Sequence, residues 1–302
     1  MTMTSNKPYE KLLERLPVYS LPNLCHLYRV RENTGFDKTD ITQFGYNHNT
    51  DQIERSRLNK KGEPVLYTST HPVVAAMETN ISRDFYMVKY KNREGLKLSS
   101  FIAVDDNCSM LENSTSRKMR NAIVSHFSEE ELYVTDQLRK ILETPYNADD
   151  VDKYKESSEL ASKIFEVVDT IVTYSRAGGD CIKDLNYTFN RLAADRYAEI
   201  ETIYHCEMPQ NVARMEHVVT EVGLPDKDGN VIRWYDNLTV DEDSLRIHHF
   251  QGDVLGVKDV LKKYGKKLMP NVNISLFDEE HIAKINLING NYDVRFYFQP
   301  LT

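Results

Sequence analysis

One segment, GEPVLYTSTHPVVAAMETN at residues 62–80, constrains the fold of this chain more than any other. Its apolar stretch at 64–68 is short and rich in residues that favour sheets, which is typical of a buried strand. The Ser-Thr pair that follows can cap a helix, and Pro72 suits a helical first turn. The segment therefore predicts a strand that leads directly into a helix ending near Thr79.

Patterns on both sides of this segment indicate a mixed α+β protein. Ser128 and Glu131 form a capping-box pattern at the start of one helix. Residues 33–60 are polar and are expected to form a long loop, a feature that is often functional inside a domain. Further strands are predicted at 24–31, 85–90, 98–104 and 200–206, and helices at 7–16, 128–142, 156–176 and 187–197.

The character of the chain changes in its last 80 or so residues. The sequence DKDGN at 226–230 is a hairpin turn signal. A helix is predicted at 253–264, and strands at 271–277, 281–288 and 292–298. We expect these strands to extend the main sheet, since three strands alone bury little surface. The predicted divisions are a helical extension at 1–20, a main domain at 21–220 and a β-rich extension at 221–302.

Charge and hydropathy argue against several classes of protein. The 302 residues carry a formal net charge of −8, which repels phosphate backbones, so broad nucleic-acid binding is not expected. No stretch approaches 18 consecutive apolar residues, so we expect no membrane span. The polar N-terminus does not resemble a signal peptide. A cytoplasmic protein is therefore predicted.

The cysteines and histidines predict no metal site. The four cysteines are 25 residues apart at their closest, so no CxxC pair exists for a zinc knuckle. The chain also lacks an HExxH pattern. His248 and His249 would point to opposite sides of a strand, which favours surface or partner contacts over a metal hydrolase.

The first set of candidate site residues lies on the predicted strand 24–31. Arg29 and Arg31 stand beside Tyr28 there. An arginine is permanently charged and presents a planar fork of N–H donors, which suits a pyrophosphate group. Arginines on strands also commonly point into solvent, so this segment alone leaves both interpretations open.

The second set lies where the long loop meets the next strand. Arg57 and Asn59 flank the loop, and Gly62 permits a tight turn. Tyr67 ends the apolar run and can present its ring to a flat ligand. A basic surface turn followed by a core tyrosine is the alternative, and this segment alone does not decide between the two.

The third candidate is Glu78 on the predicted helix. It lies four residues after Val74 and so shares a face with it, beside Met77 in the apolar stripe. A carboxylate at the edge of a buried face requires a partner or a function. The alternative is a frayed helix end that leaves Glu78 in water.

In combination, these residues resemble the RES-domain family, which is named for an arginine, a glutamate and a serine. The resemblance consists of Arg29, then Arg57-x-Asn59-x-x-Gly62, then a Leu-Tyr pair at 66–67, then Glu78. It covers residues 21–220 and is most specific over RLNKKGEPVLYTSTHPVVAAMET, where eleven positions separate the tyrosine from the glutamate. The family has an ADP-ribosyltransferase-like fold, and many members are toxins of toxin–antitoxin pairs that degrade NAD in the cytoplasm.

The resemblance also implies a tyrosine-bearing helix and a following strand. Tyr187 would begin the helix, and the strand IYHCEMPQN contains Tyr204, Cys206 and Asn211. In this alignment Cys206 occupies the place of the family serine, although a thiol is a much weaker hydrogen-bond donor than a hydroxyl. Ser175 is the alternative occupant of that role.

The implied fold is ADP-ribosyltransferase-like, with mixed sheets and flanking helices. The implied activity is cleavage of the nicotinamide–ribose bond of NAD, with NAD as substrate and no cofactor or metal. Glu78 would stabilise the positive charge that develops on the ribose. The implied catalytic residues are Glu78, Arg29 and Cys206, and the binding residues are Arg29, Arg31, Arg57, Asn59, Tyr67, Tyr28 and Tyr204.

The acceptor of the ribosyl group stays open between water, phosphate and a protein side chain. The enzyme is thus expected to be a glycohydrolase or a phosphorylase. One alternative is an ADP-ribosyltransferase that modifies a macromolecule and docks it through the C-terminal extension. Another is a nucleotide-binding module whose catalysis is weakened by Cys206. A protein antitoxin is implied as a partner, and a homo-oligomer stays open.

Overall fold

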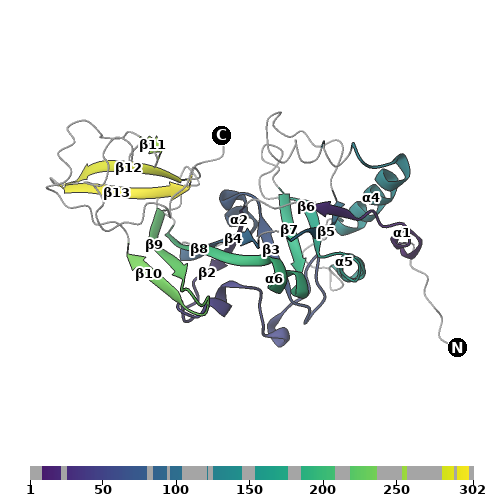
Figure 1. Ribbon diagram of the computed structural model, residues 1–302, viewed down its shortest axis with the longest axis horizontal. Helices are drawn as coiled ribbons and strands as arrows, with labels where there is room; N and C mark the ends of the chain where they lie inside the picture. The colour runs from purple at the N-terminus through teal and green to yellow at the C-terminus, as the bar shows by residue number, and fades with distance from the viewer. Residues whose placement is uncertain are drawn as a thin grey trace. The chain divides into compact units, whose positions relative to one another are not determined.

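The structure is a computed structural model, and it describes residues 9–21, 26–79, 84–93, 96–103, 121, 125–144, 154–175, 185–207, 218–236, 254–256, 281–288 and 291–298. It has mixed α and β content, with a large, mostly antiparallel sheet and a few helices (Figure 1). Among these residues we find no helix with the length and apolar content that crossing a membrane requires.

The chain divides into two compact units that differ from the predicted domains. The first unit comprises residues 1–29, 42–78 and 90–199, and the second comprises 30–41, 79–89 and 200–302. Residues 200–220 therefore group with the C-terminal residues and not with the main domain predicted at 21–220. Two short segments from the N-terminal half join them because their strand and loop residues pack in the second unit.

The strands of the first unit are hydrogen-bonded in the order β1–β5–β6–β7–β3–β2. β5 and β6 run parallel, and the other neighbouring pairs in this order run antiparallel. A parallel pair needs a long crossover, and the described part of the chain between β5 and β6 includes the helices α4 and α5. The bounds of the strands are β1 (Tyr19–Leu21), β2 (Leu27–Glu32), β3 (Val65–Ser69), β5 (Leu98–Ala103), β6 (Thr170–Tyr174) and β7 (Leu185–Asn190).

The helices α4 (Glu129–Leu142) and α5 (Lys155–Phe165) cover β5 and β6 (Figure 1). The predicted capping box is confirmed, since the Ser128 and Glu131 side chains each bond to the other residue's backbone N–H. One apolar stripe from each helix enters a common core with the strands, at a gain of roughly 2 kcal/mol for each large apolar side chain that is fully buried. Its members include Leu138, Leu142, Leu160, Ile164, Phe101 and Ile171. The short helix α1 (Glu10–Leu13) lies within the predicted helix 7–16.

Two predicted helices are partly strands. The helix predicted at 156–176 ends at Phe165, and β6 follows at Thr170–Tyr174 with every side chain buried. Its β-branched run favours a strand because such side chains pack well on a pleated surface. The helix predicted at 187–197 begins only after Asn190, whose side chain caps α6 (Arg191–Tyr197) by accepting from the Ala193 N–H at 2.8 Å.

The remaining strands follow in the order β4–β8–β9–β13–β12–β11, with β10 paired to β9. They belong to the second unit, except for the end of β4 after Lys89 and the start of β8 before Ile200. The C-terminal strands therefore extend a sheet, as expected, since β13 pairs with β9 at Phe296↔Val219. The strands are β4 (Asp84–Asn92), β8 (Ala198–Glu207), β9 (Val218–Pro225), β10 (Ile232–Asp236), β11 (Val254–Gly256), β12 (His281–Ile288) and β13 (Asn291–Phe298).

The C-terminal predictions have mixed outcomes. The turn at 226–230 is confirmed, with Gly229 at φ 69° and the Asp226 carboxylate accepting from the Asn230 N–H at 2.9 Å. The strands at 281–288 and 292–298 are confirmed. The helix predicted at 253–264 is wrong at 254–256, which form β11. Its remainder and the strand predicted at 271–277 lie outside the described residues.

A network around His205 lies inside the second unit. The His205 Nε2 is 2.6 Å from Asp84 Oδ1, and its Nδ1 is 3.0 Å from Glu221 Oε2. The Tyr86 ring stacks on the imidazole with a centroid distance of 4.8 Å. His205 therefore links β4 to β9 from its place on β8.

The same network secures the segment at 33–39. Lys38 Nζ donates to both carboxylate oxygens of Glu221 at 2.7 Å. Asn33 donates to Asp84 Oδ2 at 3.0 Å, and Trp234 Nε1 donates to the Lys38 carbonyl at 2.8 Å. These hydrogen bonds thus attach the segment at 33–39 to residues of β4, β9 and β10.

We expect His205→Leu to destabilise the second unit by about 2 kcal/mol, because two carboxylates lose their shared partner and face an apolar side chain. The single tryptophan, Trp234, reports this unit, so urea unfolding followed by its fluorescence measures the change. Lys61→Ala is the control, since Lys61 and Glu54 form an exposed ion pair that contributes little. An unchanged fluorescence midpoint in His205→Leu would contradict the stabilising role of the network.

Candidate functional site

The corner between β3 and α2 (Pro72–Thr79) confirms the predicted strand-to-helix segment. Thr70 connects this corner to the start of β7. Its N–H and its hydroxyl both contact the Leu185 carbonyl, at 3.0 and 3.2 Å, and the Leu185 N–H lies 3.3 Å from the Thr70 hydroxyl. The helix therefore begins at a fixed point on the sheet.

The carboxylate of Glu78 lies at the other end of this helix. Val74 is fully buried, whereas Glu78 is exposed, so the residue sits at the edge of the apolar face. Its Oε1 accepts a hydrogen bond from Ser175 Oγ at 2.5 Å and from Asn186 Nδ2 at 2.9 Å. Glu78 thus has defined partners at an accessible helix end, in place of the frayed end that was the alternative.

Strand register brings these three residues together. Asn186 on β7 is paired with Ser69 of β3 on one side and with Thr173 of β6 on the other. Ser175 directly follows the last residue of β6 and is only 2% exposed. The donors to Glu78 therefore come from two neighbouring strands that are separated from it by 97 and 108 positions along the chain.

Tyr67 presents its ring while its hydroxyl is held in the loop before β3. The hydroxyl contacts Ser56 Oγ at 2.5 Å, Asn59 Oδ1 at 3.1 Å and the Leu58 N–H at 3.3 Å. Burial of this hydroxyl raises the pKa of Tyr67 to about 12. The residue as a whole is nevertheless 38% exposed, so its exposed part is the ring. The ring is thus fixed and available to a flat ligand.

The neighbouring loop residues are also in fixed positions. Asn59 is 3% exposed, and its amide donates to the carbonyls of Glu54 and Lys60, each at 2.9 Å. Arg57 lies close enough to the Tyr67 hydroxyl for its charge to lower the pKa of that group, against the larger effect of burial. The buried Arg57 Nε has no hydrogen-bond partner among the described residues. Asn59 is therefore a structural anchor of the loop. Arg57 keeps its Nε–H group as an unused hydrogen-bond donor within the described residues.

The predicted residues of β2 fall in different units. Arg29 belongs to the first unit, where its Nη1 donates to the Gly45 carbonyl. Tyr28 is fully buried. Arg31 belongs to the second unit, where its guanidinium lies 4.2 Å from the centre of the Phe36 ring. Of the two predicted arginines, Arg29 thus shares a unit with Glu78.

Tyr204 and Cys206 are both fully buried on β8 in the second unit. The Cys206 thiol donates to the Tyr204 carbonyl at 3.6 Å, and burial raises the pKa of that thiol. Ser175, the alternative to Cys206 in the sequence, contacts Glu78 through its hydroxyl. Asn211 lies outside the described residues.

Asn186 is a residue that the sequence interpretation missed. The helix predicted at 187–197 began just after it, and Tyr187 is in fact a fully buried residue of β7. Asn186 is the first polar residue of the strand LNYTFN, and assigning this segment as a strand would have made it a candidate.

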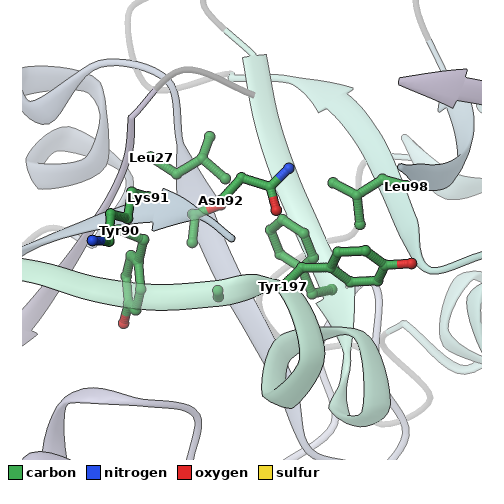
Figure 2. Close-up of a pocket in the computed structure, with 9 residues that line it drawn as sticks. Leu27, Tyr90, Lys91, Asn92, Leu98 and Tyr197 are labelled. Atoms are coloured by element: carbon green, nitrogen blue, oxygen red, sulfur yellow. The ribbon is translucent and has the colours of Figure 1, made fainter. Parts of the chain in front are cut away.

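The small pocket in Figure 2 is not a nucleotide site. It lies in the first unit between Leu27, Asn92, Leu98 and Tyr197. Its volume is about 10 Å³, roughly the space that one water molecule needs. Within the described ranges, no three His, Cys, Asp or Glu side chains converge in the way that a metal ion needs.

We expect Tyr67→Phe to lower the unfolding free energy of the first unit by about 1 kcal/mol, because Asn59 and the Leu58 N–H lose a buried partner. Thermal melting followed by far-ultraviolet circular dichroism measures this change. Tyr133→Phe is the matched control, since Tyr133 is 60% exposed on α4. Equal melting temperatures for the two variants would show that the hydroxyl does not stabilise the loop.

Comparison with known proteins gives no further assignment. No family model, curated protein or solved structure matches this chain.

Proposed function

We propose that this chain is an enzyme that cleaves the nicotinamide–ribose bond of NAD, acting as the toxin of a toxin–antitoxin pair in the cytoplasm. The observation that carries the proposal is the Glu78 carboxylate, exposed at a helix end and held by Ser175 and Asn186. The same unit contains Arg29, Arg57, Asn59 and Tyr67, which are further residues on which the resemblance to RES domains rests. The proposal includes an ADP-ribosyltransferase-like fold.

The reaction suits a fixed carboxylate. When the bond from ribose C1′ to the nicotinamide nitrogen breaks, the bonding electrons leave with nicotinamide, which becomes neutral. Positive charge develops on the ribose, as in glycoside hydrolysis, and water or phosphate then attacks C1′. A carboxylate in a fixed position stabilises that charge without reorganisation during the reaction. Because the leaving group starts as a cation, the mechanism needs no strong general acid.

Binding would use the remaining residues of the same unit. The exposed ring of Tyr67 stacks on a flat heterocycle in this proposal. Arg57 supplies its unpaired buried donor, and Arg29 supplies the guanidinium donors that its bond to Gly45 leaves over, toward the pyrophosphate. A protein antitoxin would restrain the enzyme by covering these arginines.

The primary test is nicotinamide release from NAD by the purified chain, followed by chromatography with and without phosphate. We expect Glu78→Gln to lower kcat by about 100-fold or more, because glutamine keeps the shape but removes the charge. Glu166→Gln, at an exposed ion pair with Lys163 on α5, is the control and should retain full activity.

The products separate the alternatives. Dependence on phosphate identifies a phosphorylase, and free ADP-ribose identifies a glycohydrolase. Transfer of label from NAD to a macromolecule would identify a transferase. The proposal fails if no nicotinamide is released under any condition. A wild-type kcat in Glu78→Gln would show that Glu78 has no role in the mechanism.

A second pair of variants tests whether Ser175 or Cys206 has the role of the family serine. We expect Ser175→Ala to lower kcat about 10- to 100-fold, because a carboxylate loses one of its hydrogen bonds. Cys206→Ser should lower stability, since it places a hydroxyl in a fully buried site, and should leave kcat of the folded enzyme unchanged. Steady-state kinetics with melting curves tests both, and the reverse pattern would restore Cys206 to the site.

A further inference from the structure

Of the two polar groups in the side-chain amide of Asn186, the NH₂ group has a hydrogen-bond partner among the described residues and the carbonyl oxygen does not. Its Nδ2 donates to Glu78 Oε1 at 2.9 Å, whereas its Oδ1 is buried without a hydrogen-bond partner among the described residues. An ionised carboxylate accepts hydrogen bonds and does not donate them, so the amide nitrogen must face Glu78. This requirement directs the carbonyl oxygen toward the interior.

A buried carbonyl oxygen without a partner destabilises a fold. An apolar side chain of similar size would avoid this penalty at position 186. The buried oxygen therefore does not account for an asparagine at this place, whereas the hydrogen bond from its amide nitrogen to Glu78 does.

The backbone of Asn186 is paired with a strand on each side. It lies in β7 between two paired strands, and the preceding residue, Leu185, is bonded to Thr70. Glu78, by contrast, is the last residue but one of an eight-residue helix, where helical structure commonly frays. The hydrogen bond thus joins a side chain on a strand that is paired on both sides to a carboxylate in the last turn of a short helix.

We propose that Asn186 is a positioning residue for Glu78, which fixes the direction of the carboxylate during NAD cleavage. This inference rests on the proposed function. Ser175 and Asn186 approach the same oxygen from neighbouring strands, and two donors restrict rotation where one would permit it. Positioning contributes to rate because a misdirected charge no longer faces the ribose in the transition state.

Asn186→Leu tests the proposal, with Thr135→Val as the matched control. Thr135 on α4 also has a buried side-chain oxygen without a partner among the described residues. Both variants should melt at or above the wild-type temperature, because each removes a buried unsatisfied group. Only Asn186→Leu should lose kcat, by about 10- to 100-fold at nearly unchanged KM. Asn186→Ala, which adds no bulk, should show the same split between kcat and KM.

Two results would overturn the proposal. One is full kcat in the folded Asn186 variants. The other is a loss of activity that follows a loss of stability, which indicates a structural role alone.

A measurement that does not depend on NAD cleavage tests the contact between Asn186 and Glu78 independently of the proposed function. The side-chain amide signals of Asn186 can be identified in nitrogen–proton correlation spectra by their loss in Asn186→Ala. They should move on Glu78→Gln and stay in place on Glu166→Gln. If the wild type releases no nicotinamide but these signals move, NAD cleavage fails and the positioning contact stands. Signals that do not respond to Glu78→Gln overturn the positioning contact whether or not NAD is cleaved.

Discussion

The pairing of β7 with both β3 and β6 is the constraint on which the candidate site depends. It places Asn186 between the two strands, sets Ser175 beside it at the end of β6, and receives the β3–α2 corner through Thr70. A shift of one residue in either pairing would turn Asn186 to the opposite face of the sheet. The geometry around Glu78 is therefore a property of strand register more than of the helix that carries it.

The two units solve the problem of partly buried charge in different ways. In the second unit, Lys38 forms an ion pair with Glu221, so the network around His205 contains opposite charges in contact. In the first unit, the donors to the Glu78 carboxylate include a hydroxyl and an amide, both neutral. Neutral donors fix a carboxylate without cancelling its charge. Such donors are compatible with the role in NAD cleavage that we propose for Glu78.

Local signals in the sequence were sufficient for β3, α2 and Glu78, because a short apolar strand, a helix cap and a first-turn proline all lie within one segment. The sequence predicts Ser175 only as an alternative to Cys206, and it does not predict a role for Asn186. Their roles depend on strands that pair across about 100 residues, and helical spacing of apolar residues near 160–171 concealed β6. Cys206 was chosen by alignment to a family pattern, and neither alignment nor composition reports that a side chain is fully buried.

The separation of 108 residues between Glu78 and Asn186 has a consequence during synthesis. At typical translation rates of 5–20 residues per second, roughly 5 to 20 s pass between the addition of the carboxylate and the addition of its amide partner. Throughout that interval the nascent chain contains Glu78 on a strand-and-helix segment that already has β2 as one sheet neighbour but still lacks β7, the other. Chains that terminate early, before β7, would contain the loop and the glutamate but not the assembled site. The order of the strands thus makes completion of the first unit a condition for any chemistry at Glu78.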